Sequence, residues 1–193
     1  MLVNASGGDA ILASVGDSVY REFQISVRQA WSPDAQLFVS YVRAATDAES
    51  NDFGSIFTNL DTALLEPNET SSPGIADVPH RLRAWATFTL PRRVVISPAV
   101  DWRSGFPYTA QDLYRHYAGG FNTERLPTYF AVDLTAFKTF DVFTRKMDLG
   151  VQVFNLTDHF NPRDVISVIG SPRFQELTNN PGVTFGGYMQ VRW

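Results

Sequence analysis

Apolar and polar residues alternate along most of this chain. In seven segments an apolar residue stands at nearly every second position, with polar or charged residues between. A period of two indicates a β-strand that keeps one face apolar. No segment has a helical period, so the sequence predicts an all-β fold. The segments expected to be strands are 20–30, 35–45, 81–90, 94–104, 128–138, 147–156 and 182–193.

The expected strands are long, and their connections alternate in length. About 11 residues at ~3.3 Å each give roughly 36 Å. Tilted by ~45°, such a strand crosses roughly 25 Å, the height of the apolar band on an outer-membrane barrel. Short connections ("WSPD", "PRR" and "DVFTRK") alternate with long ones at 46–78, 104–126 and 158–182. This pattern is typical of up-and-down transmembrane barrels, with short periplasmic turns and long extracellular loops.

The charged residues on the apolar faces fall at strand ends. Arg43 and Lys138 can extend their head groups toward water from these places. On the opposite faces, mid-strand polar residues are expected to face the lumen of the barrel. These residues are Arg83, Asp101, Asp133 and Gln152.

Two details of the strand pairing can be predicted from the "PRR" turn. If Leu90 pairs with Val94, Arg83 falls opposite Asp101, and we expect an ion pair there. Pro98 lies on an apolar face inside a strand, where a proline removes a ladder hydrogen bond. A bulge, or a shorter strand than expected, would explain it.

Composition narrows the possible functions. Charged residues make up 19% of the chain and aromatic residues 13%, with a net charge of −4. Typical soluble domains carry about 25% charge, and a basic footprint for nucleic acid is missing. The chain has no cysteine, which excludes a disulfide framework and a thiolate zinc site. No apolar run approaches the ~20 residues of a membrane helix, and "MLVNASGGDA" lacks the features of a signal peptide.

Candidate catalytic and metal-binding residues are few. His80, His116 and His159 lie in or beside loops, far apart in sequence, so a solvated or structural role is favoured over a metal site. The acidic stretch 47–52 lacks the spacing of a calcium loop. Ser104 has no nucleophile elbow around it. We therefore expect no enzymatic activity, no cofactor and no metal.

Aromatic residues gather near strand ends and in the expected long loops. Interfacial girdle positions are favoured for them over a stacking surface for a ligand. Ligand contacts, if any, are expected in the long loops, and the sequence does not name the residues. The aromatic residues are Trp85, Trp102, Phe106, Tyr108, Tyr114, Tyr117 and Phe121.

Several stretches together resemble the last part of the barrel of a TonB-dependent outer-membrane receptor. They are "DVPHRLRAWATFTLP" (77–91), "SGFPYT" (104–109), "PTYFAVDLTAFKTF" (127–140), "VFNLTDHFNP" (153–162) and the terminal aromatic strand. "GDSVYREFQISVRQ" (16–29) is similar to a late strand of such barrels. The nearest group is the receptors whose amino-terminal extension is a carboxypeptidase-regulatory-like domain.

The resemblance implies a 22-stranded barrel with an amino-terminal plug that imports large or scarce nutrients. This chain departs from that pattern, because it offers about seven strands, no candidate plug and no TonB box. Bacterial single-chain barrels have even strand counts. Residues 1–193 are therefore interpreted as the carboxy-terminal portion of a receptor barrel, which binds and transports substrate only as part of the full receptor.

The same resemblance implies partners and a location. The partners are outer-membrane lipid, the barrel-assembly machinery, and the remainder of the receptor barrel and plug, with TonB reached only through the missing amino-terminal part. The location is the outer membrane of a Gram-negative bacterium, with the carboxy terminus in the periplasm. The last strand, which ends in an aromatic residue, is implied to be the assembly signal. Its residues are Phe185, Gly187, Met189, Val191 and Trp193.

Two further interpretations stay open. The chain could form a small complete outer-membrane barrel of eight strands, with a structural or adhesion role and with residues 3–15 as the extra strand. Separately, the first of the seven strands could begin as early as "DAILAS", with Gly16 as a bend. Alternatively, the chain could be a soluble lipocalin-like binding module, although the outer faces of a soluble barrel should then be polar.

Overall fold

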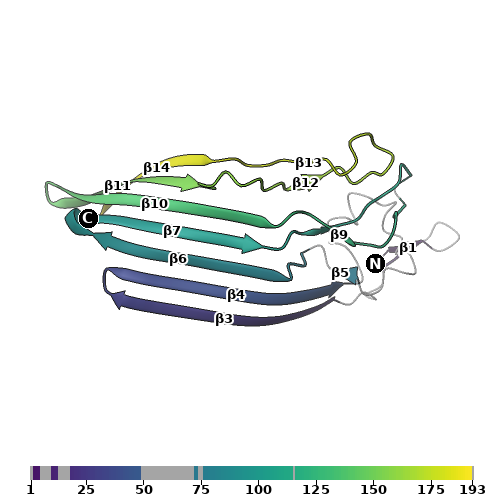
Figure 1. Cartoon of the computed structure of the whole chain (residues 1–193), viewed down its shortest axis with the longest axis horizontal. Coiled ribbons are helices and arrows are strands. Elements are labelled where there is room, and N and C mark those ends of the chain that lie inside the picture. Colours follow the sequence, from purple (N-terminus) through teal and green to yellow (C-terminus); the bar gives the residue numbers. More distant parts are fainter. Residues whose placement is uncertain are drawn as a thin grey trace.

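One long antiparallel sheet dominates the protein (Figure 1). The computed structural model describes residues 2–4, 10–12, 18–48, 72–73, 76–114 and 116–192. Within these residues there is no α-helix, only a single 3-10 turn at Pro91–Arg93, so the all-β prediction is confirmed. The long strands are β3 (Ser18–Ser32), β4 (Ala35–Ala48), β6 (His80–Leu90), β7 (Val94–Arg103), β10 (Tyr129–Val142), β11 (Arg145–Phe154) and β14 (Thr184–Arg192).

The strands follow one another across the sheet. Their spatial order is β14-β11-β10-β7-β6-β4-β3, so each long strand pairs antiparallel with the next long strand in the chain. This is the up-and-down meander that the sequence predicts. The remaining strands are β1 (Leu2–Asn4), β2 (Ala10–Leu12), β5 (Ser72–Pro73), β8 (Pro107–Tyr108), β9 (Glu124–Arg125), β12 (Asp164–Val165) and β13 (Leu177–Thr178).

The amino-terminal segment differs from both expectations for it. Strands β1 and β2 pair with each other, with Leu2 opposite Leu12, and form a sheet of their own. The early start of the first long strand is therefore wrong, because β3 begins at Ser18. The described part of residues 3–15 likewise forms β1 and β2 and adds no strand to the long sheet.

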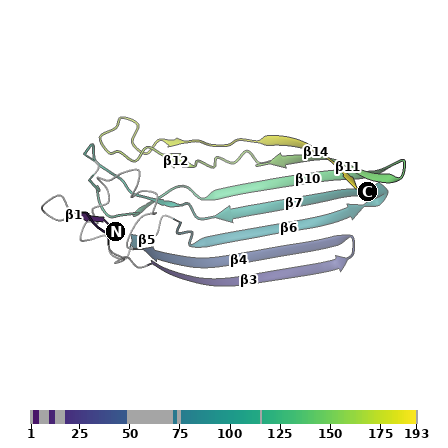
Figure 2. The ribbon, with the colours of Figure 1, turned by 180° about the vertical axis from the view of Figure 1, so that it is seen from behind.

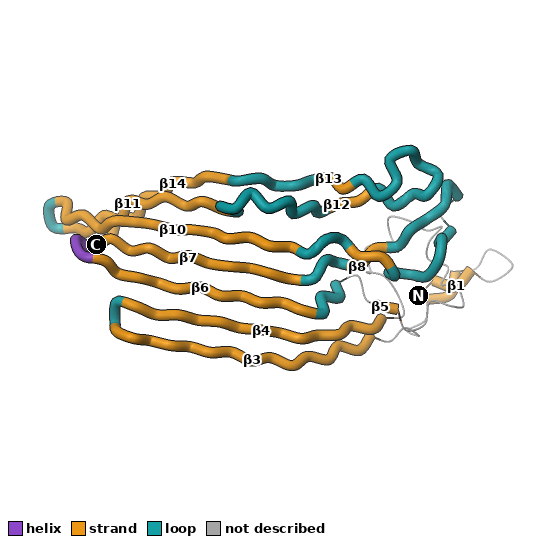
Figure 3. The backbone as a smooth tube through the Cα atoms, in the orientation of Figure 1, coloured by secondary structure: helices purple, strands orange, loops and turns teal. Residues whose placement is uncertain are grey.

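Tight turns lie at one end of the sheet and long connections at the other (Figures 1 and 3). The β6–β7 turn has the three predicted residues, and the other two turns are shorter than predicted. Only Phe143 and Thr144 separate β10 from β11, because Asp141 and Lys146 still form a ladder pair. The predicted alternation of short and long connections is confirmed.

The ladder register keeps nearly all polar and charged mid-strand residues on one face and leaves the other face largely apolar. Leu90 pairs with Val94 across the 3-10 turn, and Arg83 falls opposite Asp101, as predicted. In a strand, residues two apart share a face, so these pairings fix the faces of both strands. The same matching continues through every long ladder, with one register shift near the end of β3.

Pro98 interrupts a ladder without forming a bulge. Strands β6 and β7 pair Trp85 with Ala99 and Phe88 with Ile96, and they skip the positions between. The register is the same on both sides of this gap, so no residue is inserted. Proline lacks the N–H that a ladder bond needs, while on its other side Pro98 still pairs with Leu134.

The sheet has very little hydrophobic core. The buried apolar residues of the described part are four alanines and Phe121. Large apolar side chains are instead exposed along one face of the sheet. In addition, the described residues do not close a barrel: β3 lies at one edge and β14 at the other (Figure 2).

Candidate functional site

The apolar face of the sheet carries charge only at its two ends. Arg43 and His80 form a cross-strand pair at the long-loop end, and Lys138 lies level with Val94 toward the turn end. Between these two levels, residues of β4, β6, β7 and β10 that lie side by side form four rows across the sheet, and none of the rows contains a charged residue. The rows are Tyr41–Leu82–Trp102–Phe130, Val39–Ala84–Val100–Val132, Leu37–Ala86–Pro98–Leu134 and Ala35–Phe88–Ile96–Ala136.

The height of this charge-free face can be estimated from strand geometry. Five steps of two residues each, at ~3.3 Å per residue, give about 33 Å along the strands. With strands tilted by ~40°, the charge-free height becomes about 25 Å, the height of the lipid-facing band of a membrane barrel. On the outer strands β3, β11 and β14 this face is open to its surroundings, with exposed fractions of 75% for Phe185, 60% for Phe23 and 58% for Val151. In the four central rows most residues are partly covered by their neighbours, and Phe88 is exposed.

A hydrogen-bonded cluster marks the long-loop end of the apolar face. The hydroxyl of Tyr41 lies 2.7 Å from Nδ1 of His80, and the guanidinium of Arg43 lies 2.6 Å from Nε2. The His80 ring also lies 6.5 Å from the Trp102 ring. Aromatic and cationic residues of this kind are enriched where an apolar surface meets water.

The four polar residues predicted to share a face do share one. Arg83 pairs with Asp101, Asp133 pairs with Ala99 beside it, and the register places Gln152 on the same side. The predicted ion pair is present, with Arg83 Nε 3.4 Å from Asp101 Oδ2. Sequence reasoning missed Arg81, which donates to the same oxygen at 3.1 Å. That this face lines a lumen stays a prediction.

Asp133 and Gln152 differ in their roles. Asp133 accepts a hydrogen bond of 2.9 Å from the backbone N–H of Asn155, just past the end of β11. It therefore anchors the start of the long loop that follows. Gln152 lies between Thr135 and Gly186 in the ladders on either side.

The buried carboxylate of Asp148, which the sequence analysis did not single out, joins the last three long strands, β10, β11 and β14. The Asp148 side chain is only 5% exposed, and its Oδ1 accepts from the Thr139 hydroxyl at 2.6 Å and from Arg192 at 2.9 Å. One signal was available in the sequence, because Asp148 and Arg192 both fall on the polar positions of their strands. Their pairing depends on a register that the sequence does not fix.

The terminal strand has the predicted alternation. Phe185, Gly187, Met189 and Val191 lie opposite apolar-face residues of β11, and all four are exposed. Trp193 lies outside the described residues. The assembly role of this strand stays a prediction.

An ion pair with a buried carboxylate joins the loops to the sheet. Asp77, whose side chain is 6% exposed, pairs with Arg125 and accepts from the backbone N–H of Thr46 at 2.8 Å. Arg125 also donates to the backbone oxygens of Asp77 and Gly105, both at 3.1 Å. The connection 104–126 is therefore tied to the end of β4.

Asparagine side chains complete the sheet where β11 stops. The side chain of Asn161 accepts from the Phe130 N–H at 2.9 Å and donates to the Phe130 carbonyl at 2.8 Å, so it replaces a missing strand partner. Asn155 and Asp158 have positive φ angles, which these residue types tolerate better than most. The stretch "NLTDHFNP" thus serves as the exit turn of β11.

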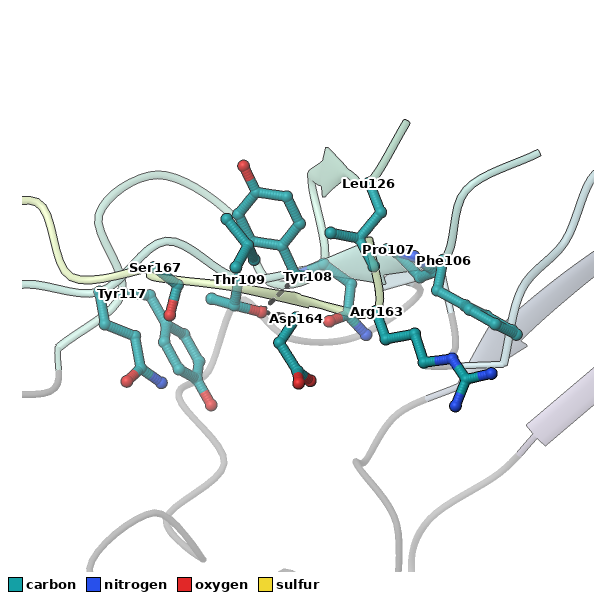
Figure 4. A pocket seen from close by; sticks show the side chains of 12 residues that line it. Phe106, Pro107, Tyr108, Thr109, Tyr117, Leu126, Arg163, Asp164 and Ser167 are labelled. Carbon is teal, nitrogen blue, oxygen red and sulfur yellow. Dashed lines mark hydrogen bonds between the residues drawn. The ribbon is translucent and has the colours of Figure 1, made fainter. Parts of the chain in front are cut away.

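The two described long connections meet beyond the end of the sheet and line an open pocket of about 420 Å³ (Figure 4). The backbone of Gln111 joins them, since its N–H donates to Ser167 at 2.9 Å and its carbonyl accepts from Ile169 at 2.8 Å. A volume of this size suits a small ligand. The lining residues are Phe106, Pro107, Tyr108, Thr109, Gln111, Tyr117, Asn122, Leu126, Arg163, Asp164, Val165 and Ser167.

Two ionisable side chains in or near this pocket, Tyr108 and Asp112, have shifted pKa values. Partial burial raises the pKa of Tyr108, with the Glu124 carboxylate adding to the shift and a hydrogen bond with Gln175 opposing it. Nearby, desolvation of Asp112 is outweighed by hydrogen bonds from the backbone N–H groups of His116 and Tyr114, so the pKa of Asp112 is lowered. Tyr108 is therefore neutral and Asp112 ionised near neutral pH.

The described residues contain no group of three or more histidine, aspartate or glutamate side chains that could hold a metal ion. His159 lies beside Phe130 and Asn161, and His116 lies beside Asp112. Of the acidic stretch 47–52, only residues 47 and 48 are described. A helix long and apolar enough to cross a membrane was not found among the described residues.

The predicted aromatic residues divide among several environments. Trp102 lies on the apolar face near its long-loop end, while Trp85 lies on the polar face and stacks on Phe38 at 5.6 Å. Three others (Phe106, Tyr108 and Tyr117) line the loop pocket. The set is therefore spread over both faces and the loops, and an interfacial position for any of these residues stays a prediction.

Neither a scan against protein-family models nor a search of curated proteins finds a match for this sequence.

Proposed function

We propose that this chain is the carboxy-terminal part of an outer-membrane TonB-dependent receptor barrel, and that it takes part in substrate binding and uptake as part of the full receptor. The observation that carries the proposal is the charge-free apolar face about 25 Å high, which exposes large apolar side chains on β3, β11 and β14. In water such a face would be unfavourable, because each large apolar side chain left exposed forgoes about 1.5–3 kcal/mol. Lipid removes that penalty.

The two open edges support the same proposal. Backbone N–H and C=O groups of β3 and β14 that face outward have no ladder partner within the described sheet. Hydrocarbon does not tolerate unpaired backbone groups. The remaining strands of a receptor barrel would pair with these edges and close the wall.

The polar face and the loop pocket fit the transport part of the proposal. In a closed barrel the face of Arg83, Asp101, Asp133 and Gln152 would line the lumen. The long connections would face outward, with the pocket between residues 104–126 and 158–182 available to a substrate. A soluble lipocalin-like module fits less well, because it keeps its apolar face inside the barrel.

Single cysteines test the location and the orientation, since the chain has no cysteine of its own. Tyr114→Cys places a thiol in a long connection, where the native side chain is 82% exposed. Thr144→Cys places one in the β10–β11 turn. Each variant is made in the native gene, and intact cells are treated with a membrane-impermeant maleimide.

The expected result is labelling of Tyr114→Cys on intact cells, with Thr144→Cys labelled only after the outer membrane is permeabilised. Fractionation should recover both variants with the outer membrane. Equal labelling of the two positions on intact cells, or recovery in a soluble fraction, would contradict the proposal.

A further inference from the structure

Two arginines are direct cross-strand partners on the polar face of the sheet. Arg81 of β6 lies opposite Arg103 of β7 in the ladder. Directly opposed like charges destabilise a sheet. Such an arrangement needs a compensating negative charge between or beside the two side chains.

The carboxylate on these two strands supplies only part of that charge. Asp101 pairs through Oδ2 with Arg81 at 3.1 Å and with Arg83 at 3.4 Å. Two guanidinium groups thus share one carboxylate, and the third, that of Arg103, forms no ion pair with it. Moreover, Nε of Arg81 and Oδ1 of Asp101 are buried without any hydrogen-bond partner, so the ion cluster does not satisfy itself.

Arg103 is held by aromatic rings rather than by an acid. Its guanidinium carbon lies 4.5 Å from the centre of the Tyr129 ring and 4.9 Å from that of Phe106. No hydrogen bond or ion pair of this guanidinium occurs with the described residues. Stacking uses the face of a guanidinium and leaves its edge, with the N–H donors, available to a ligand.

Neighbouring carboxylates on the polar face are occupied elsewhere. Asp133 accepts from the backbone of Asn155, and Glu22 on β3 accepts from the Tyr20 hydroxyl at 2.6 Å. Meanwhile Phe106, on which Arg103 stacks, also lines the loop pocket, so the Arg103 end of the cluster formed by Arg81, Arg83 and Arg103 lies next to that pocket.

We propose that Arg81, Arg83 and Arg103 form a binding site for an oxyanion, such as a phosphate, sulfate or carboxylate group of a small solute. Guanidinium groups match these anions through paired N–H donors. An anion at the edge of Arg103 would offset the repulsion between Arg81 and Arg103. The inference depends on the sheet alone and does not require that the sheet lie in a membrane.

The test uses the full chain in detergent micelles at low ionic strength. Sodium phosphate, sodium sulfate and sodium acetate are titrated separately, each against sodium chloride at matched ionic strength, and thermal unfolding is followed. A ligand that binds only the folded state raises its stability. We expect at least one of the three oxyanions to raise the unfolding temperature above the chloride control.

Two variants distinguish oxyanion binding at this site from general screening of surface charge by salt. Arg103→Gln removes the stacked guanidinium, and we expect it to weaken oxyanion binding by about tenfold or more. Without oxyanion, the same variant should unfold at a higher temperature than the wild type, because the opposed charges are gone. Arg92→Gln is the matched control, since it removes one exposed positive charge in the 3-10 turn and should behave like the wild type.

The direction of the Arg103→Gln effect distinguishes this site from a merely structural role. A structural arginine would lower the unfolding temperature when replaced, both with and without oxyanion. That outcome, an oxyanion effect no larger than that of chloride, or an equal effect in Arg103→Gln, would overturn the proposal. The membrane location, which the cysteine labelling tests, is unaffected by any of these results.

Discussion

The two faces of the same sheet are held in different ways. On the polar face, side chains contact one another across strands: Asp148 joins Thr139 and Arg192, and Asp101 joins Arg81 and Arg83. On the apolar face, the large side chains of β3, β11 and β14 extend into their surroundings with more than a third of their surface exposed. The first face supplies its own partners, while the second depends on what surrounds it.

This difference indicates which interactions stabilise the sheet. The backbone ladders and the polar-face contacts are interactions within the chain, so they form whether the apolar face is surrounded by water or by lipid. The apolar face contributes only when water is removed from it, because the hydrophobic effect requires that apolar surface leave water. Substitutions on the two faces should therefore respond differently to lipid.

The largest expected effect comes from a charge placed on the apolar face. Val153 pairs with Leu134, near the middle of the charge-free band, and Val153→Arg should destabilise the protein in lipid vesicles by about 2–4 kcal/mol, the cost of a lipid-facing arginine near the midplane. Its neighbour Gln152→Arg lies on the polar face of the same strand and should cost about 1 kcal/mol or less. Urea unfolding in vesicles measures both, and equal costs would remove the distinction between the faces.

The next effect is the loss of the buried carboxylate on the polar face. Asp148→Ala removes the acceptor for Thr139 and Arg192 and should cost about 2 kcal/mol. The exposed pair of Arg93 and Asp141 supplies the control, since Asp141→Ala should cost about 0.5 kcal/mol. The cost of Asp148→Ala should be the same in detergent and in lipid, and a strong dependence on lipid would count against our account of this face.

A smaller effect is expected from the aromatic pair on the polar face. Trp85 stacks on Phe38 with the rings 27° apart, and Trp85→Leu should cost about 1 kcal/mol through lost stacking. Phe88→Leu, on the apolar face of the same strand, should cost less in lipid because acyl chains replace the lost contact. Unfolding of both variants in vesicles checks the order, and a larger cost for Phe88→Leu would reverse it.

The smallest expected effect is an increase in the free energy of unfolding. Pro98→Ala restores an N–H in the gap of the β6–β7 ladder and should stabilise the protein in lipid by about 0.5 kcal/mol. Amide hydrogen exchange at Ala86 and Thr87 would report the change directly, with slower exchange expected in the variant. Faster exchange would show that the proline itself holds this region in place.

Much of the fold could be predicted because the period of two is a local property. Phe130, Val132 and Leu134 alternate with polar residues, and that alternation suffices to predict β10 and its two faces. The pairing of Arg83 with Asp101 was also predictable, since the three-residue turn between β6 and β7 leaves little choice of register. Long connections offer no such constraint.

The parts that could not be predicted involve residues brought together across those connections. Asp77 and Arg125 are 48 positions apart and Asp148 and Arg192 are 44 apart, and nothing local in the sequence marks them as partners. The loop pocket likewise depends on the contact between Gln111 and Ser167. The number of possible arrangements for such loops is too large for propensities to choose among them.

The sequence by itself therefore determined the strand class, the two faces and the alternation of turns and loops, because each follows from residues within one strand or one short turn. Only the tertiary structure decided which charges meet. Arg81 joins Asp101, and Arg103 stacks on Tyr129 and Phe106, because the ladder register and the loop path place them side by side. Side-chain partners across a sheet are fixed by register, and register is a property of the whole sheet.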